Sequence, residues 1–336
     1  LTYKDLKKKV FSLSKNFNKG SINILICNNS IDSIILYLSL MKAKAIPILL
    51  NVGINSNVLN NYATNYKVRN IIVPKENALD ITCEKFRFGE FIIYELNNDV
   101  IIKDTKIALL LTTSGSTGNP KLVKISRKNL ISNTKSICQY LAIKKSHRHI
   151  TTLPMNYTYG LSCINTFLYS GASILINNYS ILERKFWDLI KNYKPTSLAG
   201  VPYTYEILSR IGIDKLKDTS LEVYTQAGGK LDEKILENFS DFCTKNNYLF
   251  YVMYGQTEAT ARMSYVPPNM LSSKIGSIGI PIPGGKFRID YENNYIKDVL
   301  DEKKSGELIY EGENVFQGYS FDYKDINNNK DISFQL

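Results

Sequence analysis

Ten consecutive residues have the composition of a loop that could hold a polyphosphate. Residues 112–121 read TTSGSTGNPK and follow an apolar run at 107–111 that predicts a buried strand. Two glycines permit backbone conformations that side chains would block, so that N–H groups can form an anion-binding concavity. Hydroxyl groups and a lysine supply further donors. The predicted phosphate ligands are Thr113, Ser114, Gly115, Ser116, Thr117, Gly118 and Lys121.

This stretch differs from the common P-loop, whose pattern is G-x-x-x-x-G-K-[ST]. Here Gly115 is followed by Gly118, and Lys121 comes three residues after the second glycine. A second glycine pair, within residues 279–285, has the right spacing but carries glycine where the lysine is needed. A flexible surface turn rich in small polar residues is the alternative interpretation of the ten residues.

A second polar stretch, YGQTE at residues 254–258, follows a predicted strand at 250–253. In an open parallel sheet, ligands collect beyond the carboxyl ends of the strands. The ring of Tyr254 could stack on a purine, and the hydroxyl of Thr257 could bond a phosphate oxygen. The carboxylate of Glu258 could hold Mg²⁺ directly or through water. Five residues alone are weak evidence, but together with the upstream loop they predict a nucleotide site.

The two stretches resemble the signatures of the adenylate-forming (AMP-binding) superfamily. This superfamily includes acyl- and aryl-CoA synthetases, adenylation domains of peptide synthetases, and luciferases. TTSGSTGNPK resembles its phosphate-binding signature, and YGQTE resembles its Y-G-x-T-E motif. The resemblance implies that Lys121, Thr257 and Glu258 are catalytic, with Glu258 as the metal ligand. It also implies nucleotide contacts from Tyr254, Gly255, Gln256 and Thr257.

Further segments extend the resemblance over nearly the whole chain, to about Tyr319. The turn at Gly228 and Gly229 resembles the one that lines the other face of the adenine, although a plain strand-to-helix turn is the alternative. Residues 153–160 resemble an L-P-x-F-H-x-Y-G segment, with Tyr157 in the histidine position. The segment lacks the aspartate that amino-acid-activating members carry, so a free α-amino acid is not favoured. Residues predicted to bind the acyl substrate are Tyr157, Gly200, Val201, Gln226 and Met253.

The resemblance implies activation of a carboxylic acid by ATP and Mg²⁺ to an acyl-adenylate. Transfer to the thiol of CoA or of a carrier protein's phosphopantetheine would follow, so the expected partners are a small carboxylic acid and an acyl-carrier protein. A non-catalytic or degenerate nucleotide-binding module of the same fold is the alternative. A serine hydrolase is disfavoured because the segment around Ser162 lacks the second glycine of G-x-S-x-G.

Two departures from the family bear on this prediction. No T-G-D follows Tyr319, and the family's C-terminal lid of about a hundred residues, the size of a small domain, has no counterpart. We therefore interpret the chain as the N-terminal large domain only, either a truncated sequence or a partial enzyme that needs a partner. Because the lid supplies an essential lysine in the family, we expect this chain alone to be weakly active or inactive.

Alternating strand and helix patterns must position these residues. They predict an α/β fold of two packed subdomains with mainly parallel sheets, followed by a small β subdomain where glycine and proline recur. The predicted boundaries are 1–106, 107–268 and 269–320, with a polar tail at 321–336. A helix is predicted at residues 2–17, with Thr2 and Asp5 in a capping arrangement.

Composition limits the remaining possibilities. The net charge of +11 follows from heavy use of lysine throughout, and we expect no nucleic-acid partner. No apolar run approaches 18 residues, so no membrane span is predicted. Five scattered cysteines without C-x-x-C favour a reducing, cytoplasmic setting over a zinc or redox site.

Overall fold

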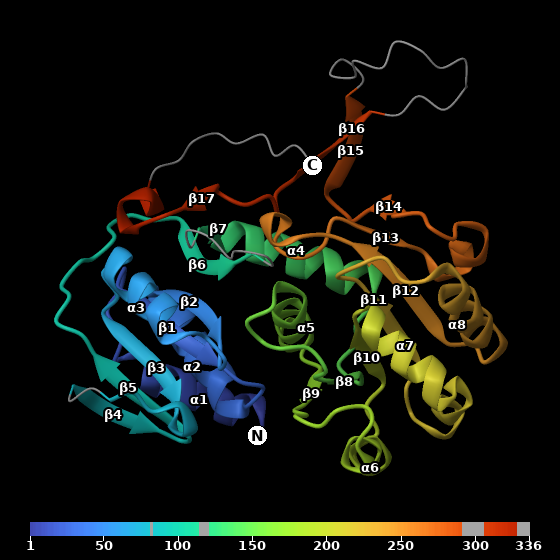
Figure 1. Cartoon of the computed structure of the whole chain (residues 1–336), viewed down its shortest axis with the longest axis horizontal. Helices are drawn as coiled ribbons and strands as arrows, with labels where there is room; N and C mark the ends of the chain where they lie inside the picture. The colour runs from blue at the N-terminus through green and yellow to red at the C-terminus, as the bar shows by residue number, and fades with distance from the viewer. Residues whose placement is uncertain (81–82, 114–120, 291–305, 328–336) are drawn as a thin grey trace.

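The computed structural model describes residues 1–80, 83–113, 121–290 and 306–327 (Figure 1). Its α-helices in these ranges are α1 (Tyr3–Ser14), α2 (Ile31–Ala43), α3 (Ser56–Asn65), α4 (Arg127–Tyr140), α5 (Thr158–Tyr169), α6 (Arg184–Tyr193), α7 (Pro202–Ile211) and α8 (Glu233–Lys245). The strands are β1 (Ile22–Cys27), β2 (Ile46–Asn51), β3 (Asn70–Pro74), β4 (Glu84–Phe88), β5 (Phe91–Glu95), β6 (Ile107–Thr112), β7 (Leu122–Ser126), β8 (Arg148–Ile150), β9 (Ser173–Leu175), β10 (Ser197–Gly200), β11 (Val223–Gln226), β12 (Leu249–Tyr254), β13 (Ser264–Val266), β14 (Ile280–Pro281), β15 (Gly285–Asp290), β16 (Glu307–Gly312) and β17 (Tyr319–Ser320).

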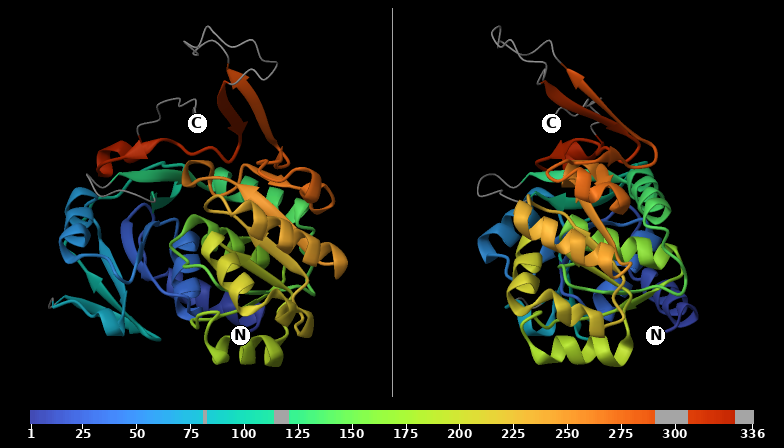
Figure 2. Two further views of the ribbon diagram at one scale, coloured as in Figure 1. Left: turned by 45° about the vertical axis from the view of Figure 1, so that its right-hand side comes forward. Right: turned by 90° about the vertical axis from the view of Figure 1, so that its right-hand side faces the viewer.

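Most strands belong to two large sheets with parallel centres. The first has the order β17-β7-β6-β2-β1-β3-β5-β4, and the second has the order β14-β13-β12-β11-β10-β8-β9. Strands β6, β2, β1 and β3 run parallel, as do β12, β11, β10, β8 and β9. The hairpin β15–β16 stands apart and projects from both sheets (Figure 2). The predicted α/β fold with a small β unit is confirmed.

The first sheet is covered on both faces, which explains its nearly continuous apolar strands. Successive residues of β1 enter different cores: Leu25 packs with α1 and α2, whereas Ile24 packs with α3. The first of these cores also takes in residues of α5, so the two α/β halves share apolar contacts. The predicted cap of α1 is confirmed, since the Asp5 amide donates to the Thr2 hydroxyl at 3.2 Å.

Strand β7 was not predicted, although it directly follows the phosphate loop. It is buried along its whole length and pairs antiparallel with β6. Its central residue is Lys124, which interrupts the apolar pattern by which a buried strand is recognised. The Lys124 ammonium donates to the backbone carbonyl of Asp325 at 2.8 Å, and burial lowers the pKa of this lysine. Because of this buried lysine, the apolar pattern of the sequence did not predict strand β7.

The two large sheets divide the chain at other places than the predicted subdomain boundaries. Both β6 and β7 belong to the first sheet, so a division at residue 107 falls inside that sheet. Strand β14, from the segment predicted as a separate β subdomain, extends the second sheet. Strand β17 returns to pair with β7, which places Tyr319 next to the end of the phosphate loop.

The five cysteines are free thiols. Among the helices that the structure describes, none combines the length and apolar character that a bilayer crossing requires.

Candidate functional site

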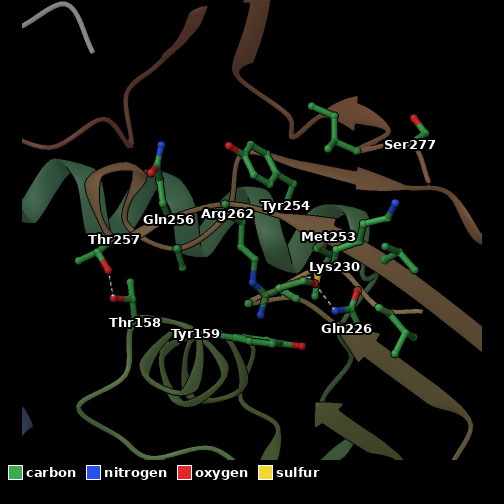
Figure 3. A pocket seen from close by; sticks show the side chains of 18 of the residues that line it. Thr158, Tyr159, Gln226, Lys230, Met253, Tyr254, Gln256, Thr257, Arg262 and Ser277 are labelled. Carbon is green, nitrogen blue, oxygen red and sulfur yellow. Dashed lines mark hydrogen bonds between the residues drawn. The ribbon is translucent and has the colours of Figure 1, made fainter. Parts of the chain in front are cut away.

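A cavity of about 610 Å³ lies where β11 and β12 end, a size typical of ligand sites (Figure 3). Its lining includes Thr113, from the end of the first sheet, and the start of α5. The predicted site residues that line it are Thr113, Tyr157, Gln226, Gly228, Gly229, Met253, Tyr254, Gly255, Gln256, Thr257 and Glu258. Residues Ser114, Gly115, Ser116, Thr117 and Gly118 lie outside the described part of the chain.

The two predicted motifs meet at this cavity. The ammonium of Lys121, at the end of the first motif, lies 4.1 Å from the ring centroid of Tyr319. The hydroxyl of Tyr319 donates to Oε1 of Glu258, in the second motif, at 2.8 Å. A single tyrosine thus contacts both the lysine and the glutamate, although they are far apart in the sequence. In the sequence Tyr319 marks only the end of the family resemblance, and no role at the site is predicted for it.

Glu258 has the surroundings expected of a ligand for a hard cation. The Glu258 side chain is buried. The partial burial of Tyr319 and its hydrogen bond to Glu258 raise the pKa of Tyr319, so that the phenol stays protonated and donates. Among the described residues, no group of three or more His, Cys, Asp or Glu could hold a metal by itself. Mg²⁺ commonly takes one or two carboxylates and completes its shell with water and substrate phosphates. The single carboxylate of Glu258 beside Thr257 fits that kind of site.

The turn that carries Glu258 is held in an unusual backbone conformation. Thr260 and Ala261 have φ angles of 54° and 108°, which side chains normally disfavour. The segment after β16 holds this turn: the Asn314 side chain donates to the carbonyls of Ala259 (2.8 Å) and Arg262 (3.0 Å). Gly255 is required here, because a Cβ atom would lie 1.9 Å from the Ala261 oxygen. Asn314 is a positioning residue that the sequence did not indicate.

The turn after β11 forms another wall of the cavity. Gln226 fixes it by donating from Nε2 to the carbonyl of Gly229 at 2.8 Å. Gly228 has φ +84°, and a Cβ atom there would lie 2.4 Å from the Tyr157 hydroxyl. The atom that approaches Gly228 most closely is therefore the hydroxyl oxygen of Tyr157. Tyr254 lines the same cavity and is partly buried, which raises its pKa.

Two predicted substrate residues lie behind the cavity wall. Gly200 packs against α7, where a Cβ atom would meet Thr204 and Tyr205 within 3 Å. Val201 contacts the turn at Gly228 from outside the lining. The sequence missed Thr158, whose hydroxyl lies 3.0 Å from that of Thr257.

Arg262 is also among the residues that line this cavity. Its side chain is 2% exposed, and the guanidinium carbon lies 4.5 Å from the centroid of the Tyr159 ring. No motif indicated this residue. Its only signal in the sequence was its position four residues after YGQTE.

The serine-hydrolase alternative finds no support in the geometry. Ser162 donates to the Tyr159 carbonyl at 2.6 Å and accepts from Arg262 at 3.1 Å. The buried histidine, His149, instead lies against Ser197, with 3.1 Å between Nδ1 and Oγ. Neither histidine lines the main cavity.

His149 should make the fold sensitive to acid. Burial, with a smaller contribution from the charge of Arg262, lowers the pKa of His149 to about 3. Between about pH 6.5 and pH 3 the unfolded chain then binds more protons than the folded one. Stability is therefore retained above pH 6.5 and falls on acidification, by up to about 1.4 kcal/mol per pH unit.

Urea unfolding at pH 7, 6 and 5 tests this expectation. The His149→Gln variant should lose less stability on acidification than the unmodified chain, and His147→Gln serves as the comparison because His147 is only partly buried. Equal losses in the unmodified chain and in His149→Gln would contradict the assignment.

Comparison with known proteins agrees with these signatures. The family model "AMP-binding enzyme" matches residues 1–320. The 2-succinylbenzoate–CoA ligase of Staphylococcus epidermidis (strain ATCC 35984) is 24% identical over 96% of the chain. The chain spans 65% of that relative's length.

Solved structures show the same fold. The long-chain-fatty-acid-CoA ligase of Archaeoglobus fulgidus gives a TM-score of 0.75 at 19% identity, over 98% of this chain and 71% of that one. An E. coli MenE variant with bound OSB-AMS gives 0.72 at 17% identity, over 96% and 66%. The family match covers far more than half of the residues, and the chain therefore belongs to the AMP-binding enzyme family.

Proposed function

We propose that the protein activates a carboxylic acid with ATP and transfers the acyl group to a thiol. The observation that carries this proposal is that Tyr319 contacts both Lys121 and Glu258. Glu258 lines the cavity together with Thr113 and Thr257. A cation, hydroxyl donors and a buried carboxylate around one cavity are the groups that a magnesium-bound triphosphate needs.

The names of the relatives support a CoA ligase. They include 2-succinylbenzoate–CoA ligases and a long-chain-fatty-acid-CoA ligase. Similarity at this level leaves the acid itself open, so the proposal specifies a small carboxylic acid. CoA is the proposed acceptor, with a carrier phosphopantetheine as the other thiol of the same chemistry. The free thiols are consistent with a cytoplasmic location.

The first half-reaction needs positioning and charge compensation rather than a protein nucleophile. A carboxylate oxygen attacks the α-phosphorus, an O–P bond forms, and the bond to the bridging oxygen breaks, which releases pyrophosphate. Lys121 would compensate charge on the β- and γ-phosphates, together with the predicted loop ligands. Thr257, oriented by Thr158, would donate to the α-phosphate. Glu258 would hold Mg²⁺, which supplies further charge neutralisation when bound.

The remaining walls of the cavity would hold the nucleoside and the acid. Tyr254, Gly255, Gln256 and the turn at Gly228 and Gly229 would bind the adenine. Tyr157, Gln226 and Met253 would contact the acyl group. In the second half-reaction the thiol sulfur attacks the acyl carbonyl, the thioester forms, AMP leaves and the thiol proton passes to solvent.

Hydroxamate trapping tests the proposal. The natural protein, with any sequence that follows residue 336, is incubated with ATP, Mg²⁺, hydroxylamine and a panel of carboxylic acids. We expect at least one acid to give hydroxamate and pyrophosphate in equal amounts. A protein that binds ATP but activates no acid in a broad panel would instead be a non-catalytic nucleotide-binding module.

A further inference from the structure

Another large cavity lies at the opposite end of strand β6 from the candidate nucleotide site. Its volume is about 720 Å³, and Ile107, the first residue of β6, lines it. Thr113, directly after the last residue of β6, lines the main cavity instead. A strand of six residues spans about 20 Å, so one small ligand cannot fill both cavities. We call the cavity at Ile107 the basic cavity.

Cationic side chains dominate the rim of the basic cavity. Five of its lining residues are cationic and two carry carboxylates, which leaves an excess of three positive charges. The cations are Lys19, Lys44, Lys106, Arg127 and Lys128, and the carboxylates belong to Asp104 and Glu313. Lys128 pairs with Glu313 at 2.9 Å, and the other four cations have no carboxylate partner among the described residues. A hollow lined mostly by one sign of charge concentrates ions of the opposite sign.

Buried polar residues form part of the floor of the basic cavity and fix its shape. The first turn of α4 contributes Ser126 and Asn129, both buried. The Ser126 hydroxyl caps this helix by accepting from the Asn129 amide at 3.1 Å. The Asn129 side chain donates to the backbone carbonyls of Glu313 and Val315, both at 2.7 Å. Two walls of the cavity are therefore joined before any ligand binds, and a preformed site costs less to occupy.

The segment after β16 contacts both the basic cavity and the turn that carries Glu258, and its residues alternate between them. Those that line the basic cavity are Glu313, Val315 and Gln317. The intervening Asn314 donates to the carbonyls of Ala259 and Arg262 in the turn. The amide of Phe316 donates to the Glu258 carbonyl at 2.8 Å. A change in the mobility of this segment would therefore reach the turn directly.

We propose that the basic cavity binds a small anion with two or more phosphate groups, and that this anion restrains the turn that carries Glu258. Phosphate oxygens accept well from lysine ammonium groups and from the arginine fork. Since one phosphate carries at most about two negative charges, an excess of three positive charges suits at least two phosphates. The anion would bridge the first turn of α4 and the segment 312–317, and so limit the motion of both. Neither catalysis nor the identity of the acid enters this inference.

Titration of matched double variants tests the anion site. Isothermal titration measures the affinity for pyrophosphate and for fructose bisphosphate, an inorganic and an organic source of the same chemistry. We expect at least one of them to bind the unmodified chain. Lys106→Met combined with Arg127→Met should weaken that binding by about tenfold or more. Lys185→Met combined with Lys191→Met removes the same charge from exposed positions of α6 and should leave the affinity unchanged.

Three results would refute the anion site. Neither anion binds the unmodified chain, or both double variants lose affinity equally, which would be a general effect of net charge. In the third, binding survives Lys106→Met with Arg127→Met, which would place the anion in the main cavity or elsewhere. The substituted side chains are exposed, so their replacement should not prevent folding.

Hydrogen exchange tests the restraint on the turn. The anion that binds should slow amide exchange in residues 257–262 and 312–317 of the unmodified chain, and this slowing should be lost in Lys106→Met with Arg127→Met. Slowing that persists in this variant would come from an anion bound elsewhere and would contradict the inference. Binding without slower exchange in residues 257–262 would refute the restraint, although the anion site would stand.

Discussion

Glu258→Gln should abolish the contribution of Mg²⁺ to ATP binding and weaken MgATP binding by about 10- to 100-fold. The substitution keeps the size of the side chain and its hydrogen bond with Tyr319 but removes the charge that would hold the cation. Lys121→Ala should weaken binding to a similar extent, since it removes a cation from the triphosphate. Isothermal titration with MgATP measures both effects.

Two controls make this result specific. EDTA should bring the unmodified chain to the affinity of Glu258→Gln, and it should change the variant little. Lys128→Ala, which removes an exposed ammonium paired with Glu313, should bind normally. Tyr319→Phe should have a smaller effect than Glu258→Gln, because it removes one hydrogen bond but leaves both charges. Unchanged MgATP affinity in Glu258→Gln would remove Glu258 from the site.

Gly228→Ala should disturb the turn after β11, which forms one wall of the proposed nucleotide site. The residue has φ +84°, where a side chain costs about 1–3 kcal/mol, and the new Cβ would lie 2.4 Å from the Tyr157 hydroxyl. We expect a loss of ATP affinity of about tenfold or more, together with destabilisation of about 1–3 kcal/mol. Titration and urea unfolding measure the two effects.

A matched series separates strain from collision. The double variant Gly228→Ala with Tyr157→Phe lacks the hydroxyl, and the next atom of that ring lies 3.6 Å from the added Cβ, so part of the affinity should return. Gly53→Ala, at a site with open space and without positive φ, should behave like the unmodified chain. If Gly228→Ala binds ATP normally, the turn does not form the wall that we assign to it.

The sequence predicted the site best where one short segment carries several functional groups. YGQTE begins at the last residue of β12, so its position at the carboxyl end of that strand follows from the sheet architecture. The same reasoning located the turn after β11. By contrast, Gly200 ends β10 and Val201 follows it, yet both lie behind the cavity wall, because α7 packs closely against Gly200.

Residues that act through long-range contacts could not be predicted. Tyr319 reaches the site only because β17 pairs with β7, a strand that Lys124 concealed in the sequence. Asn314 reaches the carbonyls of the YGQTE turn from the segment after β16. The contacts of the Arg262 guanidinium with Tyr140, Ser162 and Met253 likewise form only when α4, α5 and β12 are packed together.

A crystal structure of the chain with Mg²⁺ and a non-hydrolysable ATP analogue tests the central assignment most directly. We predict the adenine between Tyr254 and the turn at Gly228, the phosphates beside Lys121 and Thr257, and the metal on Glu258. A second cavity of about 720 Å³, lined by Lys44, Lys106 and Arg127 among others, offers a competing basic site. A nucleotide bound there, with the first cavity empty, would contradict the account.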